Sequence, residues 1–196
     1  MAMGRPRGFD TEQAVAAALP LFMEKGYEGA SFGEIIAAMG IKPPSFYAAF
    51  GSKEQLFERV VELYAARGSA IVAAALDRPT AFEAVEALLR DTADADTDPS
   101  RPGGCLFVQG ALTCSDKATG VRADLADRRS AIEPMLEQRL TSAREADDAS
   151  IAGEPGKVAR FLSTVIQGLA VQAAGGADRS ALHDVVDVAL QGVRPH

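Results

Sequence analysis

Few side chains in this chain have the type and spacing needed for acid–base, nucleophilic or metal chemistry. The two histidines are His183, inside an expected helix, and His196, the last residue, and neither has cysteine or carboxylate neighbours at zinc-ligand spacing. The adjacent carboxylates Asp147 and Asp148 belong to an expected surface loop, and no glycine-rich segment matches the nucleotide-binding patterns. We therefore expect no catalytic residue, no metal site and no cofactor, and we predict that the protein is not an enzyme.

The two cysteines, Cys105 and Cys114, are the remaining reactive side chains. On one continuous helix, nine residues would separate them by about 13 Å, which is too far for a disulfide without a turn between them. Three interpretations stay open, namely small buried hydrophobic residues, a thiol-based sensor or the lining of a pocket. Two cysteines without a signal sequence favour a reducing cytoplasm.

Composition indicates an all-α chain. Of 196 residues, 47% are apolar and 24% are charged, with almost no alternating strand pattern, and the chain is long enough to bury a real core. No run of eighteen apolar residues occurs, so we expect a cytoplasmic protein without a membrane partner. The net charge of −7 argues against a general nucleic-acid binder. However, residues 1–75 carry seven Lys/Arg against eight Asp/Glu, a net of −1, whereas residues 76–196 carry thirteen against nineteen, a net of −6.

The strongest local pattern is the segment ASFGEIIAAMGIKPPSFYAAFGSK, residues 30–53. Ser31 and Glu34 have the spacing of a capping box and open a short helix, which Gly40 ends. The two prolines after the turn suit the first turn of a second short helix, which Gly51 ends. Two helices of about eight residues joined by a short turn containing glycine form a helix-turn-helix.

The flanking patterns predict the elements that support this motif. A helix over residues 11–25 precedes it, a long helix from residue 52 to about 75 follows it, and six of the nine phenylalanines fall between them as an expected core. Further helices are predicted over residues 80–92, 105–114, 117–144 with a kink at Pro134, 157–174 and 180–193, about nine helices in all. Residues 93–104, acidic and rich in Pro and Gly, are expected to be an exposed connection. Gly168, inside a predicted helix, indicates the close approach of another helix.

From Phe9 to Phe57 the chain resembles the N-terminal DNA-binding domain of the TetR (tetracycline-repressor) family of bacterial transcription regulators. The resemblance rests on about fifteen positions that agree in order and spacing: Phe22, Gly26, Tyr27, Ser31, Met39, Gly40, Ile41, Pro44, Ser45, Phe46, Tyr47, Phe50 and Lys53 to Phe57. It extends more loosely through Gly104-Cys105-Leu106 and the segment QGLAVQA at 167–173. It implies two domains, with the N-terminal arm and helix-turn-helix over residues 1–52 and a helical ligand-binding and dimerisation domain over residues 53–196.

The resemblance implies that the second helix of the motif enters the major groove of a palindromic operator in double-stranded DNA. The expected DNA contacts are two arginines of the N-terminal arm and the residues at family contact positions: Arg5, Arg7, Ser31, Lys42, Pro43, Pro44, Ser45, Tyr47, Ala49 and Lys53. Tyr47 is expected to donate its hydroxyl to a phosphate, and Lys53 to contact another phosphate. Pro43 and Ala49 replace polar base readers of other members, so we expect shape and apolar contacts to carry more of the specificity. The alternatives are a half-buried packing role for Tyr47, a solvated charge for Lys53 and a disordered terminus for the arm.

The resemblance also implies an effector pocket in the larger domain and a homodimer made by the last two helices. Pocket candidates are isolated polar or aromatic residues in apolar segments: Cys105, Phe107, Gln109, Phe161 and Gln167. Interface candidates follow the apolar stripes of the two final helices: Phe161, Val165, Leu169, Leu182, Val186 and Ala189. Core packing inside one chain is the alternative for both sets.

Together these patterns predict a homodimeric transcriptional regulator, a repressor that an unidentified small-molecule effector releases from its operator. Two alternatives stay open. One is a helical small-molecule-binding protein without DNA binding, which the acidic charge favours. The other is a redox-sensing regulator that acts through Cys105 or Cys114.

Overall fold

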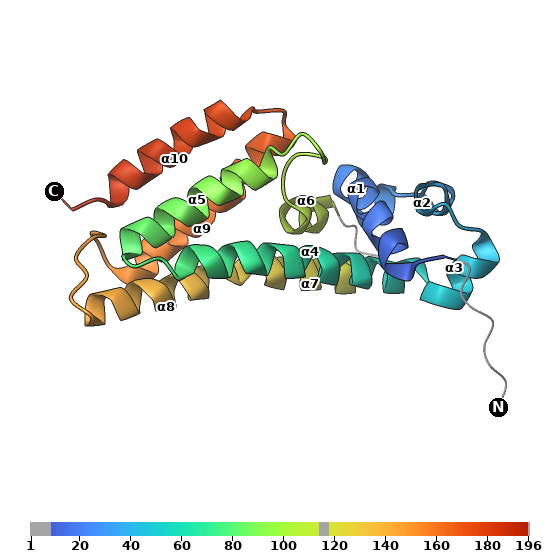
Figure 1. Ribbon diagram of the computed structural model, residues 1–196, viewed down its shortest axis with the longest axis horizontal. Coiled ribbons are helices and arrows are strands. Elements are labelled where there is room, and N and C mark those ends of the chain that lie inside the picture. The colour runs from blue at the N-terminus through green and yellow to red at the C-terminus, as the bar shows by residue number, and fades with distance from the viewer. Residues whose placement is uncertain (1–8, 114–117, 196) are drawn as a thin grey trace.

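The structure, a computed structural model, describes residues 9–113 and 118–195 and is helical throughout those ranges (Figure 1). The helices are α1 (Thr11–Gly29), α2 (Phe32–Met39), α3 (Pro43–Phe50), α4 (Lys53–Leu76), α5 (Ala81–Asp96), α6 (Leu106–Thr113), α7 (Thr119–Ser130), α8 (Ile132–Glu145), α9 (Pro155–Ala174) and α10 (Arg179–Val193). The expected all-α class is confirmed. No helix of the described ranges is long and apolar enough to cross a membrane.

An N-terminal core holds the first three helices against the start of α4. Phe22, Phe46 and Phe57 are fully buried there, and the rings of Phe22 and Phe57 meet edge to face at 5.0 Å. Leu106 of α6 and Leu125 of α7 are buried in the same core, so the later helices also contribute to it. The expectation that these phenylalanines form a core is confirmed.

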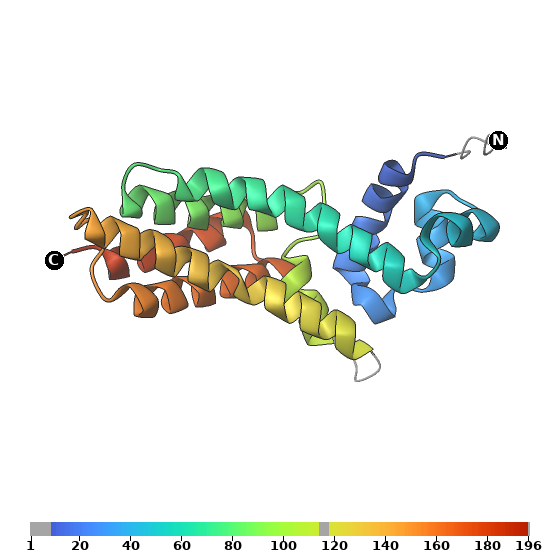
Figure 2. The same ribbon diagram turned by 90° about the horizontal axis from the view of Figure 1, so that it is seen from below.

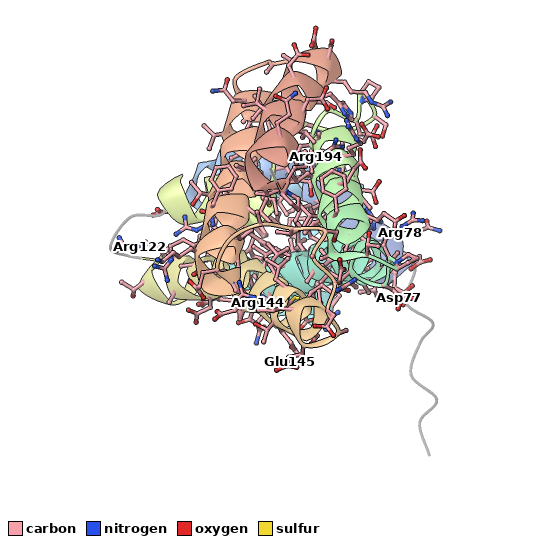
Figure 3. The ribbon with its side chains drawn as sticks, turned by 90° about the vertical axis from the view of Figure 1, so that its left-hand side faces the viewer. Asp77, Arg78, Arg122, Arg144, Glu145 and Arg194 are labelled. Atoms are coloured by element: carbon pink, nitrogen blue, oxygen red, sulfur yellow. The ribbon has the colours of Figure 1, made fainter. Side chains whose placement is uncertain are left out.

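A C-terminal core lies among α5, α8, α9 and α10. Leu88, Leu136, Leu162 and Leu169 are buried there almost completely. In the end-on view the side chains of these helices fill the space between them, with Arg144 and Glu145 at the end of α8 and Arg194 directly after α10 (Figure 3).

Helix α4 belongs to both cores and runs along most of the molecule (Figure 2). Leu56 and Val60 near its start are buried in the N-terminal core, whereas Ala75 near its end is buried in the C-terminal core. Its last carbonyls are capped by Arg139 of α8, which donates from Nε to Leu76 O at 3.0 Å and from Nη2 to Arg78 O at 3.0 Å. Helix α4 therefore connects the two cores.

The structure differs from the predicted elements in two places. The single helix expected over residues 117–144 is divided at Ala131 into α7 and α8. Pro134 lies in the first turn of α8, where its missing N–H is tolerated, so the chain starts a new helix instead of bending one. The exposed connection expected from residue 93 was wrong at its start, because α5 continues to Asp96 and this carboxylate is only 5% exposed.

Candidate DNA-binding face and effector pocket

Local hydrogen bonds fix the geometry of α2, the turn and α3. The Ser31 N–H donates to Glu34 Oε2 at 2.9 Å, and the Glu34 N–H donates to Ser31 Oγ at 3.3 Å, which completes the capping box. Lys25 of α1 donates to the same carboxylate, and hydrogen bonds from Lys25 and Ser31 lower the pKa of Glu34 to about 2. At the other end, Gly40 adopts a left-handed conformation (φ 63°) that turns the chain into α3. The helix-turn-helix is therefore specified locally.

Helix α3 buries one face and exposes the other. Phe46 and Phe50 anchor it in the N-terminal core, with 0% and 2% of their surfaces exposed. Tyr47 is 56% exposed, and its ring rests against Phe32 and Phe46 at centroid distances of 5.3 and 5.5 Å. The aromatic contacts hold the ring in place and leave the phenol accessible. The expected packing role and the expected contact role of Tyr47 are therefore compatible.

The other candidate contacts of α3 are also placed at the surface. Lys42, Pro43 and Pro44 are exposed at its N-terminal end, and Ser45 and Ala49 are half-buried. Helix α3 lies at one end of the molecule, and the C-terminal helices lie at the opposite end (Figure 1). A surface of this kind is free to enter a groove of DNA.

Lys53 and Ser31 are engaged within the protein. Lys53 Nζ donates to the carbonyl of Ala30 at 2.6 Å and lies 4.9 Å from the ring centroid of Tyr27, and partial burial lowers its pKa. This ammonium group fastens the start of α4 to the segment between α1 and α2, so the alternative of a freely solvated charge was wrong. Ser31 uses its hydroxyl in the capping box. Arg5 and Arg7 lie outside the described residues.

A cavity of about 380 Å³ opens between the helices of the larger half of the molecule. Helices α4 to α9 all contribute, and most of the lining is apolar, including Ile71, Leu88, Phe107, Ile132 and Met135. A volume and lining of this kind suit a small organic molecule.

Three of the five expected pocket residues, Cys105, Phe107 and Gln167, line this cavity. Gln109 and Phe161 do not. Gln109 donates from Nε2 to Gly103 O at 3.4 Å and so supports the loop before α6. Phe161 lies five residues before the lining residue Ile166, which on a helix is about 140° around the axis, and it is 45% exposed on the outside of α9.

Asp96 and Arg101 also line the cavity and were missed by the sequence analysis. Burial raises the pKa of Asp96 to about 7, and the positive charge of Arg101 opposes that rise. Asp96 Oδ2 and Arg101 Nε are buried without a hydrogen-bond partner among the described residues. The one sequence signal for this arrangement is Gly103-Gly104. A Cβ at either position would lie 2.8 Å from a backbone carbonyl of α9, so only glycine lets this loop pack so closely.

Cys105 and Tyr64 both line this cavity, and each contributes to the shift of the other's pKa. Burial raises the pKa of the Cys105 thiol. Because the thiolate is the reactive form, this environment disfavours a sensor role for Cys105. Cys114 lies outside the described residues.

Four of the six residues expected at the dimer interface are buried inside a single chain and so are not available to a second chain. Leu169, Leu182, Val186 and Ala189 are at most 4% exposed because they belong to the C-terminal core of a single chain. Val165 is half-buried against that core, and Phe161 is exposed. The exposed apolar side chains of α9 and α10 are Phe161, Val171, Val185 and Val188.

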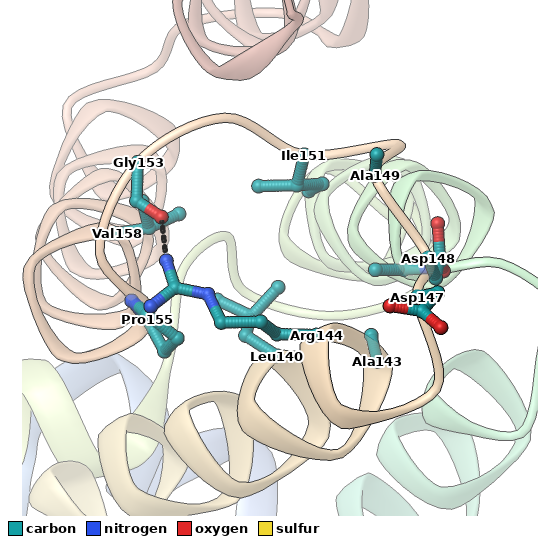
Figure 4. A pocket seen from close by; sticks show the side chains of 11 residues that line it. Leu140, Ala143, Arg144, Asp147, Asp148, Ala149, Ile151, Gly153, Pro155 and Val158 are labelled. Atoms are coloured by element: carbon teal, nitrogen blue, oxygen red, sulfur yellow. Dashed lines mark hydrogen bonds between the residues drawn. The ribbon is translucent and has the colours of Figure 1, made fainter.

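The loop that contains Asp147 and Asp148 covers a second cavity, of about 350 Å³, at the far end of α8 (Figure 4). Asp148 accepts hydrogen bonds from the N–H of Ala81 and the N–H of Ser150, so it caps the start of α5. Arg144 donates to the carbonyl of Gly153 and holds the other side of the loop. Asp148 therefore has a structural use. Among the described residues, no group of three or more His, Cys, Asp or Glu side chains is placed to hold a metal ion.

Comparison with known proteins gives the same assignment for both halves of the chain. Residues 14–60 match the family of bacterial regulatory proteins of the tetR type, and residues 81–189 match the tetracyclin repressor-like C-terminal domain. The chain is 30% identical over 192 residues to the HTH-type transcriptional repressor ComR of Escherichia coli K12, an alignment that covers 96% of this chain and 90% of ComR. It is 41% identical to the repressor BdcR of the same organism over 109 residues, 55% of each chain.

A solved structure with 38% sequence identity and a TM-score of 0.90 is a cysteine mutant of the TetR family regulator CifR, bound to double-strand operator DNA of 26 bp. The similarity covers 95% of this chain and 98% of that one. Members of this family are transcription regulators and not enzymes, and they are typically dimeric and ligand-responsive. This chain belongs to the TetR family of bacterial transcription regulators.

Proposed function

We propose that this protein is a homodimeric repressor that binds a palindromic operator through α3 and leaves it when a small molecule fills the cavity among α4 to α9. The observation that carries this proposal is the outward face of α3. There an ordered but accessible tyrosine, two exposed prolines and an exposed lysine lie together at the end of the molecule. The regulator works where the chromosome is, and we therefore assign it to the cytoplasm.

The contact set that we propose for DNA is Lys42, Pro43, Pro44, Ser45, Tyr47 and Ala49. The Tyr47 hydroxyl donates to a backbone phosphate, and the prolines make apolar contacts in the major groove. Lys53 contacts a phosphate only after it leaves the carbonyl of Ala30, and Ser31 keeps its capping role while it approaches the backbone. Arg5 and Arg7 follow the DNA from the N-terminal arm.

Two functional units follow from this proposal, residues 1–52 for DNA and residues 53–196 for effector and dimer. The boundary separates roles and does not mark a physical break, because α4 starts at Lys53 and is buried in both cores. The two family matches, over 14–60 and 81–189, support this division.

A route from the cavity to the DNA-binding half is visible in the packing. Tyr64 of α4 and Phe107 of α6 both line the cavity, and their rings meet edge to face at 5.0 Å. The neighbour of Phe107, Leu106, is 1% exposed in the N-terminal core. A molecule that displaces Phe107 therefore shifts α6 against α1, and the separation of the two reading helices changes across the dimer.

The dimer interface that we propose uses the exposed apolar face of α9 and α10. Phe161, Gly168 and Val171 recur on one side of α9 at the spacing of successive turns, and Val185 and Val188 do so on α10. Nothing lies within 4 Å of a Cβ built at Gly168, so a second chain has room to approach there. Exposed apolar patches of this kind mark sites of protein association.

The test is a mobility shift of the purified protein on DNA from upstream of its own gene, with Tyr47→Phe and Tyr47→Ala alongside. Wild type should give a discrete shift whose affinity falls steeply with salt, because phosphate contacts release counterions. Tyr47→Phe keeps the ring contacts and loses only the hydroxyl, so about a tenfold loss is expected from a hydrogen bond to a charged group. If a folded wild-type dimer gives no shift at low salt, the protein binds small molecules without DNA, and the regulator proposal fails.

A further inference from the structure

The cavity among α4 to α9 has a mostly apolar wall, and the charged side chains Arg67 and Asp91 in its lining are exposed to solvent. Apolar side chains from five helices line most of it, and its buried carboxylate, Asp96, lies where α5 ends and the 97–105 segment begins. There Asp96 and Arg101 come from opposite ends of a tight connection that the Gly104 N–H closes by donating to Asp96 O at 2.9 Å. The ligand that fits this cavity is therefore mostly apolar, with a single polar end.

The two side chains are not paired with each other by a hydrogen bond. Asp96 is 5% exposed, and its Oδ2 has no hydrogen-bond partner among the residues described. Arg101 donates from Nη2 to Ala95 O and lies 3.8 Å from an Asp98 carboxylate oxygen, but its Nε is also unpartnered in the same ranges. Buried polar groups without partners cost free energy, and a ligand that satisfies them recovers it.

Both residues line the cavity, and Asp96 Oδ2 and Arg101 Nε have almost no exposed surface. Rotation of the Asp96 carboxyl group about its Cβ–Cγ bond, which is a soft torsion, exchanges the positions of its two oxygens. The Asp96 carboxylate offers a hydrogen-bond acceptor, and the Arg101 guanidinium offers a donor. A ligand group that satisfies both must itself donate and accept.

Among the described charged residues of the lining, Asp96 and Arg101 are those with buried unpartnered polar atoms, so a head group that satisfies these atoms lies next to both charges. When Asp96 is ionised, its negative charge offsets the positive charge of Arg101. A cationic head group of a ligand is then repelled by Arg101, and an anionic head group is repelled by Asp96. A charged head group also loses hydration free energy when it leaves water, and a pair of opposite charges does not compensate for this loss. We propose that the effector, if the proposed function holds, is an uncharged and largely apolar molecule whose one polar end donates to Asp96 and accepts from Arg101, as a primary amide does.

The pH adds a second consequence. Burial raises the pKa of Asp96 to about 7, so below this pH Asp96 no longer offsets the positive charge of Arg101, and the wall becomes more favourable to an anion. The titratable and charged groups that face Asp96 around the cavity are Tyr64 and Arg67 of α4, Asp91 of α5, Arg101 and Cys105 of the connection, and Arg128 and Arg129 of α7. Arg128 is held by the carboxylate of Asp124 at 2.9 Å.

The test compares four probes with one apolar body and different ends: 2-naphthamide, 2-naphthoate, 2-naphthylmethylammonium and 2-methylnaphthalene. Binding to the full-length protein is measured at pH 8 by isothermal titration calorimetry. The amide should bind at least about tenfold more tightly than each of the others, the equivalent of about one well-made hydrogen bond. Between pH 8 and pH 6 the naphthoate should gain on the amide.

Two variants make the test specific. In Asp96→Asn the Arg101 charge is offset only by the Asp98 carboxylate 3.8 Å away, so the naphthoate should gain about tenfold on the amide. In Arg101→Gln the cationic probe should gain instead. Asp184→Asn, which removes an exposed carboxylate of α10, should keep the wild-type order, and circular dichroism confirms the fold of each variant.

The proposal is overturned if a charged probe binds wild type most tightly, if the four probes bind equally or not at all, or if Asp96→Asn leaves the ratio of the amide and naphthoate affinities unchanged. The mobility shift of the same samples without probe separates this from the proposed function. A protein that shifts DNA but fails the probe test refutes only the ligand class. One that passes the probe test but shifts no DNA refutes the regulator.

Discussion

Replacing Asp96 by asparagine should stabilise the protein at pH 8. In the folded chain, burial raises the pKa of Asp96 from 3.8 to about 7, so the folded state binds this proton more tightly than the unfolded state does. Below pH 3.8 both states are protonated and the carboxyl group costs nothing. Between pH 3.8 and 7 only the unfolded state ionises, and wild type loses stability as the pH rises.

Above pH 7 both states are ionised and the loss is complete. The difference between 3.8 and about 7 corresponds to about 4 kcal/mol, at about 1.36 kcal/mol for each pH unit. Asparagine has nearly the same shape and carries no charge. The variant should therefore gain a few kcal/mol over wild type at pH 8 and almost nothing at pH 4.

The assay is urea denaturation of both proteins between pH 4 and pH 8, at one fixed protomer concentration because a dimer's stability depends on concentration. Other titrating groups are shared by the two proteins and cancel in the difference. Asp184→Asn, with its exposed side chain, should change the free energy of unfolding by less than about 0.5 kcal/mol at every pH. A variant that is no more stable than wild type at pH 8, or a difference that does not change with pH, would refute the burial argument.

Three further predictions concern the frame around the cavity and the dimer. Arg139→Ala removes the hydrogen bonds to the carbonyls of Leu76 and Arg78 at the end of α4 and should lower the free energy of unfolding by about 1–3 kcal/mol in urea denaturation. Arg139→Lys, which lacks the forked guanidinium, should restore only part of that stability. Gly104→Ala should cost at least about 2 kcal/mol by the same assay, since φ is +89° and the new Cβ meets a carbonyl at 2.8 Å, whereas Gly120→Ala, with open space around it, should not destabilise. Val188→Asp should turn the dimer into monomer in analytical ultracentrifugation, because it places a charge in the proposed interface at a side chain that is 68% exposed in one chain. The control Thr141→Asp, on α8, should leave the dimer intact. A Val188→Asp protein that remains dimeric would contradict the proposed interface.

The helix-turn-helix could be predicted because its determinants are local. Ser31 and Glu34 are three residues apart and bond to each other, and Gly40 turns the chain by its own backbone preference. Phe46 and Phe50 are four apart and therefore share the buried face of α3. Each of these facts needs only a few neighbouring residues, and the sequence contains all of them.

The polar end of the cavity could not be predicted, because its determinants are distant in sequence. Residues 93–104 have the composition of an exposed loop, and only the packing of Gly103 and Gly104 on α9 buries Asp96. The sequence analysis assigned a close approach to Gly168 instead, and within one chain nothing lies near that position. A glycine shows that a close approach is possible, but it does not show which element approaches.

The interface was mispredicted for a related reason. The strongest apolar stripe of an amphipathic helix faces the nearest core, so Leu182 and Val186 pack inside the chain. The association surface that we propose is a weaker second stripe set among polar residues. It includes Val185 and Val188, which are neighbours of the first stripe in the sequence. Periodicity alone does not say which of two adjacent stripes meets another chain.

The cavity and the N-terminal core share α4 and α6, and this sets a condition on any effector. Coupling between two sites is reciprocal, so a molecule that weakens operator binding by a given factor must itself bind more weakly, by the same factor, to the protein on DNA. A molecule that fits the cavity without moving Phe107 or Tyr64 makes the same contacts in both states, and however tightly it binds it shifts nothing. Affinity for the cavity and release from DNA are therefore separate properties. We infer that a ligand releases the protein from DNA only when it displaces the ring contact between Phe107 and Tyr64.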